Sequence, residues 1–546
     1  MPTSLSLHMS DSLLDEEKGD TLVVAGPPSH SSRRPCFHRA TPWQCLAFLL
    51  IVIGVLHVEL EHESSRISQA LVAGRDNKNS LVATADSNGL APSDYHPRPP
   101  IHGGTTNSKT CLSNHIPVNP HIPGRRDLSL LHTRQEIPDI NTQPGEGFMI
   151  QALTAFDGHL HLAYGDSGEN SGPLSLHAYQ PATGLWTYKG LLGTEELRLF
   201  RPYYYHNQQH GVLYTPEIDA HGDERRRQSG VYQLECGTTS QWTTTGGPIY
   251  GSAHVYDVEV MPSSDPSTPL LWASMGSRTG DVGRLVVSHN GGTNWTDVYR
   301  IPVDPHAFSR IYFIGILPGV LVYVWGRIIR HVAGDDESIQ ETFARVWYLD
   351  GIDLTTRQSY KDANFQNITN LDIAAPPDVA ADPHELSPYI RPVIYRNEMR
   401  LVAHAFRFGP HLGSYELQGT QLVPADPWPR MDQANRNIQI NQNGRGGGSS
   451  DGEEEPEEDT TELVAWMEDE QHGHLIVLME CCGGHAGVYR TNATFSSGHQ
   501  AWEEIVHLDP PADEDRYLSL ALLNNDLYLG TAQGNLYVVQ EIYQPL

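Results

Sequence analysis

The sequence predicts an all-β protein with the architecture of a β-propeller, and three observations indicate this fold. Gly and Pro are frequent, with 49 and 38 residues, as expected for a chain with many turns. Short strand-like runs alternate with turn residues over most of the chain. A tryptophan also follows a turn roughly every fifty residues, which is a period typical of propeller blades. This series comprises Trp186, Trp242 and Trp295, with Trp347 as an extension and Trp502 about three periods later.

The first repeat shows four strands most clearly. The turn Asp157-Gly158 separates two runs that we expect to form a hairpin, Met149–Thr154 and His159–Tyr164. Two further runs, Leu174–Tyr179 and Trp186–Leu191, complete the set. Comparable sets follow, so we expect about seven four-stranded blades within 128–546, with six as the alternative.

The last set is one strand short. We expect a strand near Leu128–Glu136 to complete it, which would close the ring by pairing the two ends of the propeller and hide its sheet edges.

One long apolar run precedes this domain, from Cys45 to Leu56. Arginines come before it and glutamates after it, so the positive-inside rule predicts that residues 1–42 form a disordered cytoplasmic tail. We interpret 43–60 as a transmembrane signal anchor that holds the propeller outside the cytoplasm. The run is short for a spanning helix, so a cleaved signal peptide and a buried core strand are the alternatives.

Two further segments are predicted to be disordered. Residues 61–127 are rich in Ser, Asn, His and Pro and are interpreted as a stalk. Residues 431–461 are rich in Gly and Glu and are interpreted as an acidic insertion in the propeller. A solvating role is favoured for this insertion over Ca²⁺ binding. The four cysteines beyond the anchor, compatible with one or two disulfides, are Cys111, Cys236, Cys481 and Cys482.

Charge and histidine spacing exclude two classes of function. The formal net charge is −30, from 66 acidic and 36 basic residues, and such a chain repels phosphate backbones. We therefore expect no nucleic-acid partner. The 28 histidines lie far apart without the short spacings of metal ligands, so we expect no metal site and no cofactor.

One motif carries a family resemblance. Ser288, Asn290, Gly292 and Trp295 fit the pattern S-x-[DN]-x-G-x-x-W. The chain here resembles the Asp-box (BNR-type) propellers, and is closest to membrane-anchored or secreted ones. In that family the box lies on the hairpin between the third and fourth strands of a blade and is structural. The resemblance implies that the Ser and Asn side chains bond the turn, that Gly supplies a positive φ, and that Trp packs over the hairpin.

The resemblance does not extend to sialidases. Tyr299-Arg300-Ile301-Pro302 looks like their Arg-Ile-Pro signature, but that signature precedes the first Asp box, whereas here it follows one. A sialidase activity is therefore not expected.

Five residues are candidates for ligand binding. Asp166, Glu169 and Asn170 lie in a glycine-rich loop that could present them to a sugar or a cation. His254 begins an innermost strand, and Arg391 precedes a proline and could project into the central funnel. The alternatives are a turn bonded to its own backbone, a structural histidine and an ordinary strand entry.

These observations lead to an expected function. We expect a membrane-anchored extracytoplasmic propeller that binds a carbohydrate or a surface protein at its mouth, rather than an enzyme. The alternative is a glycoside hydrolase or lyase that uses carboxylates in the funnel. Asp, Glu, Arg and Tyr clustered in the channel would favour the enzyme. Aromatic residues without paired carboxylates would favour a sugar-binding protein, and a flat apolar rim would favour a protein partner.

Overall fold

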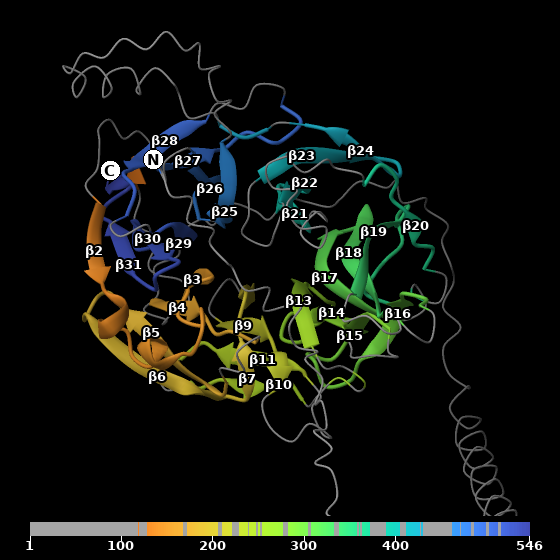
Figure 1. The fold of residues 1–546 in the computed structure, drawn as a ribbon, viewed down its shortest axis with the longest axis horizontal. Coiled ribbons are helices and arrows are strands. Elements are labelled where there is room, and N and C mark those ends of the chain that lie inside the picture. The colour runs from red at the N-terminus through yellow and green to blue at the C-terminus, as the bar shows by residue number, and fades with distance from the viewer. Residues whose placement is uncertain are drawn as a thin grey trace, which may run out of the picture. The chain divides into compact units, whose positions relative to one another are not determined.

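The computed structural model describes residues 118–119 and 128–545, apart from 221–228, 332–337, 372–388, 430–460 and shorter gaps between strands. This part of the chain forms antiparallel sheets set in a ring, so the predicted all-β propeller is confirmed (Figure 1). The predicted tail and anchor lie outside the described residues, and so do nearly all of the stalk and of the acidic insertion. No helix in the described part is long and apolar enough to cross a membrane.

Five separate sheets have four strands each in up-and-down order. The first contains β3 (Ala152–Phe156), β4 (His159–Ala163), β5 (Leu174–Gln180) and β6 (Leu185–Leu192). The second contains β8 (Arg201–Tyr205), β9 (His210–Pro216), β11 (Val231–Glu235) and β12 (Thr243–Thr244). Two more contain β21 (Tyr389–Tyr395), β22 (Glu398–His404), β23 (His411–Gln418) and β24 (Gln421–Pro424), then β25 (Glu462–Asp469), β26 (His474–Glu480), β27 (Ala486–Thr491) and β28 (Glu503–Leu508).

The fifth separate sheet closes the ring. It consists of β29 (Tyr517–Leu523), β30 (Asp526–Thr531), β31 (Leu536–Val539) and β2 (Leu128–His132). Ser129 is paired with Val538, and Leu130 with Tyr537. The expected closing strand is therefore confirmed, within the expected range.

An eight-stranded sheet occupies the rest of the ring. Its two sets of four strands are joined through a single pair, Gly276 opposite Arg310. The prediction of seven separate blades is therefore not met, since five four-stranded sheets stand alone and eight strands share one sheet. The first set is β13 (His254–Met261), β14 (Leu270–Gly276), β15 (Arg284–Ser288) and β16 (Thr296–Arg300), and the second is β17 (Ala307–Leu317), β18 (Leu321–His331), β19 (Ser338–Tyr348) and β20 (Gln366–Asn367).

Short elements accompany these sheets. β1 (Val118–Asn119) pairs with β32 (Gln544–Pro545), and β7 (Thr194–Glu196) pairs with β10 (Ile218–Ala220). Two short 3₁₀ helices, Arg134–Glu136 and Ile140–Thr142, follow β2.

Local sequence explains the strands and turns. The first hairpin turns at Asp157 and Gly158, which have φ values of 51° and 71°, as a two-residue hairpin turn requires. The second strands have hydrogen-bonded partners on both sides and neighbouring sheets on both faces. Every residue of β4 and β14 is accordingly buried, as apolar runs such as Leu270–Ala273 require.

The tryptophan series is confirmed for four of its members. Trp186 lies in the fourth strand of its sheet, and Trp242, Trp295 and Trp502 immediately precede the fourth strands of theirs. Trp347 lies instead in β19, the third strand of its set, so its assignment to the series was wrong. Its burial against the apolar core explains a tryptophan at this position.

The closing strand generates a prediction. A chain that starts at Thr133 lacks β2 and exposes the edge of β31 together with apolar surface near Leu128 and Leu131. We expect it to be destabilised by on the order of 3 kcal/mol and to aggregate. Thermal unfolding with light scattering tests this, with a chain that starts at Asn107 and retains β2 as the control. Equal unfolding midpoints for the two chains would contradict the importance of closure.

Candidate functional site

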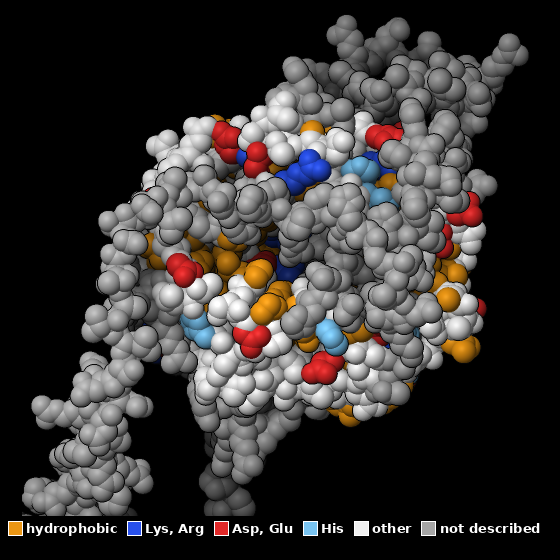
Figure 2. Space-filling model, turned by 180° about the vertical axis from the view of Figure 1, so that it is seen from behind, with side chains coloured by type: hydrophobic (Ala, Val, Ile, Leu, Met, Phe, Trp, Pro, Cys, Tyr) orange, Lys and Arg blue, Asp and Glu red, His pale blue; other side chains and the backbone are white. Residues whose placement is uncertain are grey.

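The candidate site is a charged cluster on the first strands of the sheets, which lie nearest the centre of the ring (Figure 1). Seen from behind, the molecule is hollowed near its middle, and basic and hydrophobic side chains lie in the hollow (Figure 2). The cluster combines residues from β8, β13, β17, β21 and β25.

Arg201 binds two carboxylates of β13. Its Nη2 atom lies 3.1 Å from Asp257 Oδ1 and 3.0 Å from Glu259 Oε1, and its Nε donates to the carbonyl of Val258 at 3.0 Å. Asp257 and Glu259 are two positions apart on one strand, so their side chains point to the same side. A bulge between Val255 and Asp257 shifts the register directly before them, a feature common next to binding sites.

Asp257 also connects a third sheet region to the cluster. Its Oδ2 atom accepts a hydrogen bond from the backbone nitrogen of Ile314 in β17, at 3.1 Å. The Asp257 side chain is 3% exposed, whereas Glu259 is 21% exposed. Asp257 is therefore the buried, structural carboxylate of the pair, and Glu259 is the one that solvent or a ligand can reach.

Burial sets the protonation of the two carboxylates. It raises the pKa of Asp257 against the opposing charge of Arg201. Burial also raises the pKa of Glu259 to about 7, and Arg201 again opposes the shift while Asp257 adds to it. Burial thus favours the protonated form of Glu259.

Arg391 adds a second cation and an aromatic wall. Its guanidinium lies 4.6 Å from the ring centroid of Trp466 in β25 and 5.6 Å from that of Phe313 in β17. Burial lowers its pKa to about 10; Asp257 opposes the shift and Arg201 adds to it. At neutral pH Arg391 is thus charged and half-buried, and within the described residues it has no ion-pair partner.

A second layer of polar and aromatic groups lies at the starts of the first strands and on their connections. Arg198 donates from Nε and Nη2 to the two oxygens of Glu196, at 2.7 and 2.5 Å, and Ser167 donates to the same carboxylate at 2.8 Å. The rings of Tyr256 and Tyr312 are 4.6 Å apart, and Tyr389 lies 6.0 Å from Tyr312. Each of these three tyrosines is 3% exposed, so they form part of the buried apolar core behind the cluster.

The structure places the predicted ligand-binding residues differently from one another. Arg391 lies in the charged cluster. His254 is buried, and its Nδ1 atom lies 3.7 Å from Asp219 Oδ1. Asp166 is also buried, and its Oδ2 atom accepts a hydrogen bond from the backbone nitrogen of Glu146 at 3.3 Å. Neither of these contacts is with a residue of the charged cluster. Glu169 and Asn170 lie outside the described residues.

The motif Ser288–Trp295 forms the hairpin between β15 and β16, the third and fourth strands of their set. Ser288 Oγ accepts a bond from the nitrogen of Gly292 at 2.8 Å, and Asn290 Oδ1 accepts one from Asn294 at 2.9 Å. Gly292 has a φ of 90°, and an added Cβ would lie 2.3 Å from Thr245 Oγ1. Trp295 packs beside the apolar cluster around β13 and β14.

Sequence reasoning missed Arg201, Asp257, Glu259 and Trp466. A signal was present for two of them, because Asp257 and Glu259 alternate with valines in an otherwise apolar run, which marks charges on one face of a buried strand. Arg201-Pro202 is also the same dipeptide as Arg391-Pro392. Nothing in the sequence around Trp466 indicates its contact with Arg391, since the two residues belong to different sheets.

The chain has similar solved structures but no match in sequence. The sequence matches no protein-family model and no curated protein. Similar solved structures include the Dos1 propeller, with 10% identity over 71% of this chain and 75% of that chain and a TM-score of 0.36. The α-L-arabinofuranosidase Arb93A from Fusarium graminearum has 12% sequence identity over 76% of this chain and 98% of its own, with a TM-score of 0.31. Polysaccharide lyase Uly1 has 10% sequence identity over 79% of this chain and 100% of its own, with a TM-score of 0.33. These likenesses concern the fold alone.

The buried anion generates a stability prediction. Asp257→Ala leaves Arg201 without its most buried partner and the amide of Ile314 without an acceptor, so we expect a loss of about 3–5 kcal/mol in the free energy of unfolding. Asp297→Ala removes a carboxylate that is 30% exposed and pairs with Arg284, and should cost about 1 kcal/mol or less. Denaturant unfolding measures both, and equal losses would contradict the structural role of Asp257.

The raised pKa of Glu259 generates a pH prediction. The folded protein holds this proton more tightly than the unfolded chain, so between the ordinary pKa of 4.5 and about 7 stability falls as the pH rises. Glu259→Gln removes this dependence. We expect wild type to lose stability relative to Glu259→Gln across this window, with a constant difference above it.

Unfolding free energies measured at several pH values test this expectation. Glu341→Gln, in a side chain that is 58% exposed on β19, is the matched control; it retains Glu259 and should follow the same pH course as wild type. A parallel course of wild type and Glu259→Gln would contradict the assignment.

Proposed function

We propose that this protein is an extracytoplasmic propeller, anchored by residues 43–60, that binds an acidic carbohydrate in its central channel. The observation that carries the proposal is Arg391, a charged side chain that stacks over Trp466 without an ion-pair partner among the described residues. Arginine binds carboxylates through two parallel hydrogen bonds, and an indole ring packs against the apolar face of a sugar. A uronic acid residue offers both features.

Neighbouring groups support this choice of ligand. Glu259 is partly exposed beside Arg201 and has the capacity to accept or donate a hydrogen bond to a hydroxyl group. Phe313, which is partly buried, lies 5.6 Å from the Arg391 guanidinium and adds aromatic surface beside Trp466. Aromatic surface with a few polar groups is typical of small-molecule sites.

Other features support the proposed location and family. Cys236 is disulfide-bonded, and such bonds persist in oxidising compartments outside the cytoplasm. The hairpin bonds of Ser288 and Asn290 support membership of the Asp-box propellers.

A second candidate function is a glycoside hydrolase or lyase, and Glu259 favours it. A carboxyl group with a pKa of about 7 serves as a general acid or base near neutral pH. Glu259 and Asp257 contact the same nitrogen of Arg201, so the two carboxylates are close neighbours, as in carboxylate-pair enzymes. Asp257 is too buried to meet a substrate directly, which places binding ahead of hydrolysis.

Arg391 provides the test of the proposed ligand. Arg391→Met keeps an unbranched apolar side chain but removes the cation. We expect it to weaken the binding of uronate oligosaccharides to the full-length protein by about 10–100-fold, the loss typical of a charge-assisted hydrogen bond. Calorimetric titration measures the affinities, with neutral oligosaccharides of the same length for comparison.

The matched control is Arg345→Met, which removes an arginine that also lies over an aromatic ring, at 5.4 Å from Phe343, but on the third strand of its set. Its affinity should equal that of wild type. Equal binding of uronate and neutral sugars would contradict the role of Arg391. Cleavage products in the same mixtures would put the enzyme first, and absence of any sugar binding would favour a protein ligand.

A further inference from the structure

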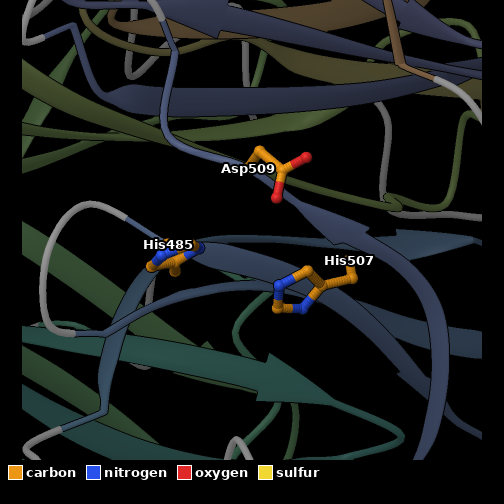
Figure 3. A group of neighbouring side chains, drawn as sticks. All are labelled: His485, His507 and Asp509. Atoms are coloured by element: carbon orange, nitrogen blue, oxygen red, sulfur yellow. The ribbon is translucent and has the colours of Figure 1, made fainter. Parts of the chain in front are cut away.

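A second group of chemically active side chains lies away from the charged cluster, on the sheet formed by β25 to β28. His485, His507 and Asp509 each offer one ligand atom, and these atoms all lie within 4.8 Å of one another. The carboxylate of Asp509 points toward the side of the sheet on which the two imidazole rings lie (Figure 3). The two histidines are half-buried, and Asp509 is exposed.

Strand register brings these residues together. Ala486 is opposite Leu508 and Gly487 is opposite His507 in the pairing of β27 with β28. His485 is one step beyond the first of these pairs and therefore lies opposite Asp509. His507 and Asp509 are two positions apart, so both share a face of the sheet with His485. The three side chains are thus directly opposite, diagonal and same-strand neighbours.

Contacts around the group hold it in place. The carbonyl of His485 accepts a hydrogen bond from the nitrogen of Cys481 at 2.8 Å, and the carbonyl of Asp509 accepts one from Tyr517 Oη at 3.2 Å. His507 Nδ1 lies 3.5 Å from Glu504 Oε1. A carboxylate at one ring nitrogen of a histidine fixes the ring and leaves the other nitrogen for a metal, which is the usual outer shell of metal-binding histidines.

One buried atom lacks a partner. His485 Nδ1 is buried and has no hydrogen bond within the described residues. A buried ring nitrogen without a partner is unfavourable unless water or an ion satisfies it. The His485 ring lies beside His507 and Asp509, so an ion held by the three side chains is a suitable partner for this ring.

We propose that His485, His507 and Asp509 form a binding site for a divalent transition-metal ion, with Zn²⁺ as the ion that fits best. Two imidazoles and one carboxylate are the donor set of many three-ligand zinc sites, in which water completes the tetrahedron. Calcium and magnesium prefer oxygen ligands throughout, so two nitrogen donors disfavour them. Sequence reasoning expected no metal site because these histidines lie far apart in the chain, and only the pairing of β27 with β28 makes them neighbours.

The position of the site gives it a structural consequence. His485 ends the connection between β26 and β27, and Asp509 begins the connection from β28 to β29 in the next sheet. An ion held by both would fasten two surface connections to each other. The proposal is independent of the sugar site, since it shares no residue with it.

Zinc titration of the full-length protein, freed of metal by a chelator and then dialysed, tests the proposal. We expect one tightly bound Zn²⁺ per chain and a thermal midpoint that rises with Zn²⁺. His507→Ala and Asp509→Asn should weaken binding at least about 100-fold, and Glu504→Gln about 10-fold, because loss of an outer-shell partner alone costs 10–100-fold. Visible absorption of bound Co²⁺ reports directly on the ligand set.

His210→Ala, which removes an imidazole on β9 far along the chain from the group, is the control and should bind Zn²⁺ as wild type does. Asp509 is exposed, so Asp509→Asn decides the question even if a histidine variant fails to fold. Unchanged zinc affinity and Co²⁺ absorption in Asp509→Asn, or no tight zinc binding by wild type, would overturn the proposal.

Discussion

The pairing of β2 with β31 is the interaction on which the rest of the structure depends. It joins residues at the two ends of the propeller, and the nitrogen of Arg134, just after β2, also donates to Asn535 Oδ1 at 3.1 Å. Each first strand contributes only one or two groups to the channel, so a shared site exists only when the sheets are held in a closed ring. Closure is therefore a condition for binding as well as for stability.

Within the ring, Asp257 is a buried residue that holds the binding-site residues in place. It fixes Arg201 from β8 and receives the amide of Ile314 from β17, so three sheet regions meet at one buried carboxylate. Two carboxylates and two arginines have different surroundings in this arrangement. Asp257 is buried against Arg201, whereas Arg201, Glu259 and Arg391 keep a degree of exposure.

The sequence predicts the features that depend on local chemistry. The fold class, the hairpin at Asp157, the closing strand near Leu128 and the hairpin of Ser288 each rest on turn residues or on alternation within one segment. The charged cluster does not, because Arg201, Glu259 and Arg391 become neighbours only through the ring. Arg391 was found from a local Arg-Pro step, and Trp347 was misassigned because a buried tryptophan fits the third strand as well as the fourth.

The closing strand also decides where mechanical load enters the protein. β2 is the outermost strand of its sheet and the first long strand of the propeller, and β1 pairs with β32, the last strand along the chain. Under the proposed anchoring, tension on the tether reaches β1 and β2 before any other strand. Pulling would therefore detach β2 from β31 first and open the ring at that sheet.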